Sequence, residues 1–305
     1  MTKESSKRHK FITKAEKKLA RKIRRLAKLF SEFVIDHFSK EFKIKDGVIT
    51  NSTSNIATAR KFERLKEKFL KKEVAPIMVE LSKELQKIHK LNLGYFKSIP
   101  DLKNSKVEFA HTKVTNKLLN RYGFDTKKVE IIKDGFLYDF AKMDDVFKKI
   151  KGEALKSALG GVPLSKFREN VDKYVVKDKG VEKHFRRLTQ NVYSQFERSS
   201  ANQVREELGL SFAILQGGII ETTRDWCRLR NDQVFHISEI LKMGTSADTY
   251  GGYTDKSTGD FQGRNKNKTY DPIEDAGDEN CRHSWDWISN KMALRRRPDV
   301  VQFLN

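Results

Sequence analysis

Residues 15–41 constrain the fold most, because their apolar side chains recur at intervals of three and four positions. The residues on this side of the pattern are Ile23, Leu26, Phe30, Phe33, Val34, His37 and Phe38. The opposite side is cationic and carries Lys17, Lys18, Arg21, Lys22, Arg24, Arg25 and Lys28. The spacing predicts one long amphipathic helix. We expect His37, at the edge of the apolar side, to be packed against neighbours and not to bind a ligand.

Helical patterns continue through the first two thirds of the chain. A second helical stretch over about 56–92 contains Pro76, which lacks a backbone donor and should kink or divide the helix. The remaining helical patterns cover about 105–121, 137–158, 164–176 and 181–208. The last of them ends at Gly209, a favourable residue for a helix C-terminus.

The sequence changes character after Gly209. Residues 211–223 are rich in β-forming side chains around a Gly pair and predict a strand, a bulge or turn, and a second strand. Residues 244–270 predict an extended loop. The fold class is therefore α+β, a long and mostly helical N-terminal region followed by a small mixed α/β C-terminal module. The expected domains are a basic helical arm or stalk over 1–100, a helical region over 101–209 and the module over 210–305.

The positive charge is unevenly distributed. The 305 residues carry a net charge of +21. Residues 1–200 hold 48 Lys and Arg against 25 Asp and Glu, whereas residues 201–305 hold 14 against 16. Such an excess attracts polyanions, most simply nucleic acid, through counterion release. The alternative is an ordinary solvated helical face. Among the basic residues, we expect the cationic side of the first helix to contact double-stranded DNA without sequence preference.

Several classes of protein are not expected. No stretch reaches the roughly 18 apolar residues that a membrane crossing needs. The basic N-terminus is not followed by the apolar core of a secretory signal. Two cysteines cannot build a disulfide framework, so we expect synthesis in a reducing compartment.

Four residues are weak candidates for a zinc site: Cys227, His236, Cys281 and His283. Zinc binds Cys and His in tetrahedral geometry. Eight residues separate Cys227 from His236, which is wider than the usual spacing of a zinc-binding pair, and a single residue separates Cys281 from His283. The alternatives are a contact or disulfide between the cysteines, or two unconnected structural thiols. We favour a site without metal or any other cofactor.

An enzymatic interpretation has some support. His236, Asn280 and His283 loosely resemble the residues of a metal-dependent nuclease, in which a His activates water beside a divalent cation. The expected hairpin and helix do not join these positions, and no Gly-rich phosphate loop is present. We therefore do not expect an enzyme. Trp285 and Trp287 could stack on bases, but burial in a small module is their expected use.

Three segments of the last third of the chain form a pattern: residues 216–227 (QGGIIETTRDWC), 231–235 (NDQVF) and 280–285 (NCRHSW). Together they resemble the C-terminal domain of the Mu F-like minor head proteins of tailed bacteriophages. Their order and spacing resemble the family over residues 185–295. This chain departs from the family at Asp232-Gln233, where a Gly is usual, and at Asp278-Glu279, where a His often stands. The second departure weakens a metal interpretation.

The resemblance implies a structural virion protein, made in the host cytoplasm and located in the head interior or at the portal vertex. Its implied partners are portal or major capsid proteins and the packaged DNA, with no membrane. The rival interpretations are a virion-carried nuclease or toxin-like effector and a cellular nucleic-acid-binding protein. The paired motifs also predict a structural cluster that joins the two ends of the module, made of Arg224, Trp226, Cys227, Asn280, Cys281, His283 and Trp285.

Overall fold

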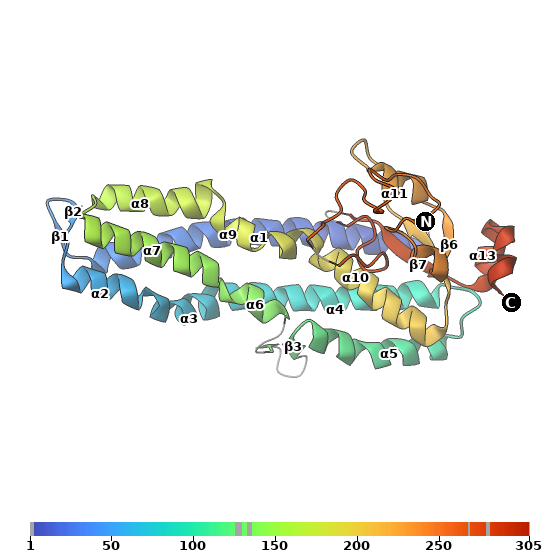
Figure 1. Ribbon diagram of the computed structural model, residues 1–305. Helices are drawn as coiled ribbons and strands as arrows, with labels where there is room; N and C mark the ends of the chain where they lie inside the picture. Colours follow the sequence, from blue (N-terminus) through green and yellow to red (C-terminus); the bar gives the residue numbers. More distant parts are fainter. Residues whose placement is uncertain (1–2, 126–129, 133–135, 268, 279–280, 305) are drawn as a thin grey trace. The chain divides into compact units, whose positions relative to one another are not determined.

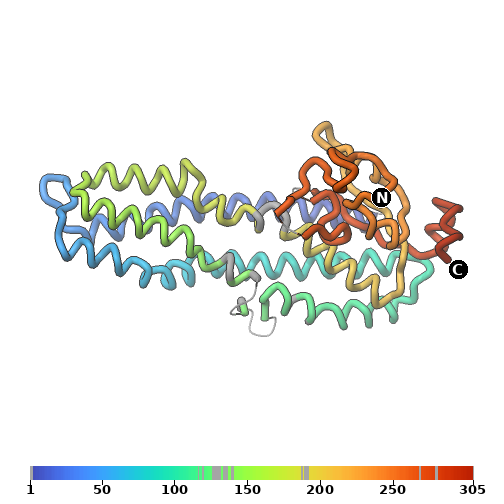
Figure 2. The backbone as a smooth tube through the Cα atoms, viewed as in Figure 1, coloured from blue at the N-terminus to red at the C-terminus, as the bar shows by residue number. Residues whose placement is uncertain are grey.

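The computed structural model describes residues 3–125, 130–132, 136–267, 269–278 and 281–304. The chain forms two compact units, each assembled from separate stretches (Figure 2). The sheet unit comprises Met1–Glu16, Lys83–Leu119 and Gln190–Asn305. The helical unit comprises Lys17–Ser82 and Asn120–Thr189. The division into 1–100, 101–209 and 210–305 stays a prediction.

Most of the chain is helical, and the strands are short (Figure 1). The first half contains α1 (Lys3–Glu41), β1 (Ile44–Lys45), β2 (Val48–Ile49), α2 (Thr53–Lys61), the 3₁₀ helix η1 (Phe62–Leu65), α3 (Lys66–Phe69), the π-helical turn η2 (Leu70–Val74), α4 (Ala75–Lys97), α5 (Asn104–Arg121), β3 (Phe124–Asp125), β4 (Glu130–Ile131), α6 (Phe136–Lys142) and α7 (Asp144–Gly160). The second half contains α8 (Leu164–Asp172), the π-helical turn η3 (Lys173–Lys177), α9 (Gly180–His184), α10 (Arg186–Leu208), β5 (Phe212–Gln216), α11 (Asp225–Arg230), β6 (Val234–His236), α12 (Ile237–Ile240), β7 (Ser284–Ile288), α13 (Asn290–Arg296) and the 3₁₀ helix η4 (Pro298–Phe303). The predicted α+β class is confirmed.

Phenylalanine rings form the core of the helical unit. Phe30 of α1 lies edge-on to Phe69 and Phe147, with ring centroids 5.1 and 5.0 Å apart. Phe62 of η1 stacks on Phe147 at 5.5 Å and lies 5.0 Å from Phe38. Such offset and edge-on contacts add to the stability that burial alone provides. The predicted apolar side of α1 is therefore the side that faces this core.

The helical stretch that contains Pro76 is divided, as predicted. The irregular part lies just before the proline, where α2 is followed by η1, α3 and η2 before α4 begins at Ala75. The N–H of Ala75 bonds to the carbonyl of Leu70, a wider turn than that of an α-helix. Because Pro76 has no N–H to donate, the chain can widen here without losing a further bond.

The sheet unit contains an antiparallel three-stranded sheet with β5 between β6 and β7. Trp285 and Trp287 lie opposite Leu215 and Ala213 on one face of β7, because alternate residues of a strand share a face. Both tryptophans are buried, as expected. The predicted second strand within 211–223 is wrong. After β5 the chain turns instead, with the N–H of Ile220 donating to Thr223 Oγ1.

Helix α1 begins at Lys3, about three turns before the predicted start. The extra turns belong to the sheet unit, where Arg8 is completely buried. Its guanidinium contacts two buried carboxylates, those of Glu197 and Asp286, and lies 5.0 Å from the Tyr95 ring. A charged residue at a core position breaks the apolar periodicity, which explains why the pattern did not reveal these turns.

None of the helices in the described part of the chain combines the length and the apolar character that a membrane crossing requires.

Candidate functional site

The predicted DNA-contacting residues occupy the solvent-facing side of α1. Lys22 is half-buried and the other six are exposed. They alternate with buried apolar residues, because α1 presents its opposite side to the phenylalanine core. The structure therefore places all seven on one accessible side of a single helix.

Two of the seven cations share a single carboxylate within the helical unit. The ammonium groups of Lys18 and Lys22 both bind the carboxylate of Glu80 in α4. In the described part of the chain, Lys17, Arg21 and Lys28 have no carboxylate partner. The accessible positive charge of α1 is therefore concentrated on a subset of the predicted residues.

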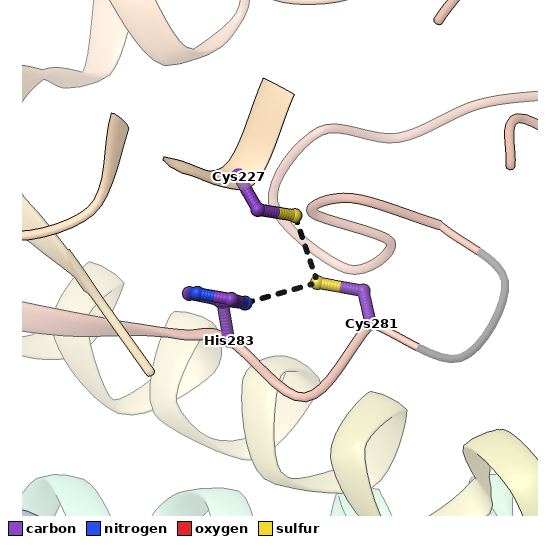
Figure 3. Close-up of side chains that lie close together, drawn as sticks. All are labelled: Cys227, Cys281 and His283. Carbon is purple, nitrogen blue, oxygen red and sulfur yellow. Dashed lines mark hydrogen bonds between the residues drawn. The ribbon is translucent and has the colours of Figure 1, made fainter. Parts of the chain in front are cut away.

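Figure 3 shows the second candidate site, in which Cys227, Cys281 and His283 point toward one another. Cys227 lies in α11, and the other two precede β7. The two sulfurs are 3.9 Å apart, and Cys281 Sγ lies 3.9 Å from His283 Nδ1. All three side chains are buried. The predicted meeting of the two motifs is thus present, although 54 positions separate the cysteines.

Two glycines allow this close approach. A Cβ atom on Gly277 would lie 2.5 Å from Cys227 Sγ and 3.0 Å from Cys281 Sγ. A Cβ atom on Gly217, directly after β5, would lie 2.4 Å from the His283 ring. Separations this short are not tolerated between non-bonded heavy atoms. Any larger residue at either position would displace the thiols or the imidazole.

Arginine side chains fix the backbone around the thiols. Arg198 of α10 donates hydrogen bonds to the carbonyl oxygens of Cys281 and His283, at 3.3 and 2.8 Å. Arg224, which precedes α11, donates to the carbonyl oxygen of Gly277 at 2.5 Å. These bonds connect α10 and α11 to the segment that carries Cys281 and His283.

The two predicted cluster tryptophans, Trp226 and Trp285, are buried, and each ring has its own neighbours. Trp226 stacks on Phe261 with centroids 5.0 Å apart, and Trp285 donates from Nε1 to the carbonyl oxygen of Pro272 at 3.0 Å. Both segments belong to the long connection between β6 and β7. The tryptophans therefore anchor this irregular connection around the cluster.

Two other predicted site residues do not add to this group. Asn280 lies outside the described residues. His236 lies apart from the cluster, where its Nδ1 is 2.8 Å from Ser238 Oγ and its ring stacks on Phe303 at 4.6 Å. His236 serves as the N-cap of α12. Its surroundings are those of a structural residue.

A pocket of about 450 Å³ opens beside the thiols. Its lining residues are Gly218, Ile220, Thr222, Thr223, Arg224, Cys227, Cys281, Arg282 and His283. The contact between the two sulfurs raises the pKa of Cys227 and lowers the pKa of Cys281. Cys281 is therefore the sulfur that carries negative charge first, and it does so beside the guanidinium of Arg198.

Sequence reasoning missed the residues that support the site. Gly217, Gly277 and Arg198 have no signature of their own in a single sequence. The only signal was indirect, because Gly217 lies within the motif-like segment 216–227 and Gly277 lies shortly before the segment 280–285.

Comparison of the chain with protein-family models, with curated proteins and with solved structures finds no match.

Proposed function

We propose that the protein is a structural component of a tailed-bacteriophage head that contacts packaged DNA through α1. The observation that carries the proposal is the row formed by Lys17, Arg21, Arg24 and Lys28. Their spacing of four, three and four positions places them on one side of α1. At 1.5 Å per residue the row is about 16 Å long, enough to contact several phosphates of a duplex.

The distribution of charge between the two units supports this assignment. The helical unit holds 34 Lys and Arg against 19 Asp and Glu, whereas the sheet unit holds 28 against 22. Sequence-independent binding to DNA depends on such an excess and weakens as salt is added. We therefore assign the DNA contact to the helical unit and protein docking, on portal or capsid proteins, to the sheet unit. The assignment of protein docking to the sheet unit is supported by the Mu F-like segments that it contains.

The test compares two variants of the full chain that lose the same charge. The first changes Lys17, Arg21, Arg24 and Lys28 to Gln. The control changes four other exposed cations of the helical unit to Gln, namely Lys61, Lys68, Lys173 and Lys183. Gln is a comparable helix former, so both variants should keep their helicity.

Binding to a short random-sequence duplex is then measured over a range of salt concentrations. Each lost phosphate contact reduces the slope of log K against log salt by about 0.9, so the α1 variant should lose about three units. The control should lose about one or less. Equal losses in the two variants would show that net charge, and not the α1 row, determines binding.

Two further measurements separate the competing functions. Supercoiled plasmid incubated with Mg²⁺ or Zn²⁺ should be shifted on a gel and remain intact, whereas degradation would identify a nuclease. Position of the gene beside portal or terminase genes would support the virion role. A chromosomal position away from any phage gene would favour a cellular nucleic-acid-binding protein.

A further inference from the structure

The imidazole of His283 is unusually poor in partners for a buried polar group. Its Nε2 atom has no hydrogen-bond partner within the described residues. The neighbour of Nδ1 is the Cys281 sulfur, at 3.9 Å. A thiol is a weak hydrogen-bonding partner, and burial of an imidazole without good partners is costly. A metal ion bound to Nδ1 would replace this weak thiol contact with a much stronger bond, and within the described residues no other group competes for the imidazole.

The distances among the three donors match the shell of a tetrahedral metal ion. Two thiolates that bind zinc at about 2.3 Å lie about 3.8 Å from each other, and a thiolate and an imidazole nitrogen lie about 3.6 Å apart. The observed separations are 3.9 Å for both. All three donor atoms lie within 4.8 Å of one another. A disulfide would instead need the sulfurs at about 2.05 Å, a much larger movement.

We propose that Cys227, Cys281 and His283 bind one Zn²⁺ ion, with the fourth coordination position open to the adjacent pocket. Two thiolates and a neutral imidazole are donors that zinc prefers. The guanidinium groups of Arg198 and Arg224 lie nearby and favour the thiolate forms. All three ligand residues line the pocket, so solvent can reach the ion.

The ion would hold together a part of the sheet unit that has little regular structure. The connection between α12 and β7 contains no helix or strand within its described residues, and Cys281 and His283 lie at its end. Closing a long irregular connection costs chain entropy, which a metal bond offsets. This role is independent of the proposed DNA contact, because the contact is assigned to α1 in the helical unit.

Zinc content is the first test. The full chain is purified under reducing conditions and its metal is measured by inductively coupled plasma mass spectrometry. We expect about one Zn²⁺ per chain, and none in Cys281→Ser or His283→Asn. His236→Asn is the matched control and should retain the ion, because His236 lies outside the cluster. Absence of zinc from the wild-type chain after incubation with Zn²⁺, or its loss from His236→Asn alone, would overturn the proposal.

Cobalt substitution tests the coordination without any variant, so it remains informative if a substitution prevents folding. Co²⁺ in the wild-type chain should give sulfur-to-cobalt charge-transfer absorption and the intense visible bands of tetrahedral cobalt. Azide should change the visible bands by occupying the open position. An unchanged spectrum at saturating azide would refute the open position. A mass two units lower, from a disulfide in freshly prepared protein, would refute the metal site.

Discussion

The interiors of the two units are built from different kinds of side chain. Among the described residues, every charged side chain that is buried lies in the sheet unit, including Arg8, Glu197, Arg230 and Asp286. The helical unit buries phenylalanine rings and keeps its charges at the surface. The interior of the sheet unit therefore depends on how its buried charged side chains are paired.

The different interiors of the two units predict different responses to substitution. A buried ion pair contributes little net stability, because desolvation cancels much of the attraction, but loss of one member leaves a buried charge without a partner. Removal of a methyl group or a ring from an apolar core costs free energy in proportion to the cavity that remains. The sheet unit should therefore be more sensitive to removal of one charge and to pH. The helical unit should be sensitive mainly to the shape of its side chains.

The largest effect is expected for Arg8→Met. It leaves the carboxylates of Glu197 and Asp286 buried without their cation, and should cost about 3–5 kcal/mol. Urea unfolding, with hydrogen exchange on peptides from β5 and β7, measures the loss in the sheet unit. Arg21→Met, on the exposed side of the same helix, is the control and should cost about 0.5 kcal/mol or less. Equal losses in the two variants would remove the distinction between the units.

A smaller effect is expected from acid. Burial and the neighbouring His111 lower the pKa of His89 to about 3, below its ordinary value near 6.5. The unfolded chain therefore binds the proton first, so stability is present above pH 6.5 and is lost as pH falls toward 3. Between pH 7 and pH 5 the loss is about 2 kcal/mol. His89→Gln should flatten this part of the profile of unfolding free energy against pH, and parallel profiles would contradict the assignment.

The aromatic core should respond to shape alone. Phe62→Leu keeps an apolar side chain but removes the ring that contacts Phe38 and Phe147, which should cost about 1 kcal/mol. The loss should be the same at pH 5 and pH 7 and at low and high salt. If urea unfolding shows that this loss changes strongly with pH or salt, then buried charged groups also stabilise the helical unit.

The smallest effect is expected at the surface of α1. Lys18→Gln with Lys22→Gln removes the two cations that share Glu80, and should change unfolding free energy by about 0.5 kcal/mol or less. The salt slope of DNA binding should fall less than in Lys17→Gln with Arg21→Gln, whose cations have no carboxylate partner among the described residues. The reverse order would place the DNA contact nearer to Glu80.

The same difference explains how much could be predicted from the sequence. In the helical unit, apolar periodicity identified the buried side of α1, and Pro76 marked a real division, because side-chain polarity and burial agree there. In the sheet unit, Arg8 and Glu197 occupy core positions that polarity assigns to solvent. The first three turns of α1 were therefore missed. Helix α11 separates β6 from β5, and β7 lies much further along the chain, so no local pattern shows which segments will pair.

The candidate site divides in a similar way. Cys227, Cys281 and His283 were predicted to meet, because two motif-like segments contain them. Gly217, Gly277 and Arg198 were not predicted, since their contributions are a missing Cβ atom and hydrogen bonds to carbonyl oxygens. Both are properties of the folded backbone. His236 was a candidate because of its residue type alone, whereas in the structure it caps α12 through Ser238 and Glu239 and stacks on Phe303.

The position of Arg8 has a consequence for the order in which the chain matures on the ribosome. Its partner Asp286 lies 278 positions later. At 5–20 residues per second, that interval lasts about 15–55 s. Throughout this time Arg8 lacks one of its two carboxylate partners, and until Glu197 is synthesised it lacks both. The helical unit, complete in sequence by Thr189, can mature earlier. A chaperone that covers the first turns of α1 would therefore have a defined period in which to act.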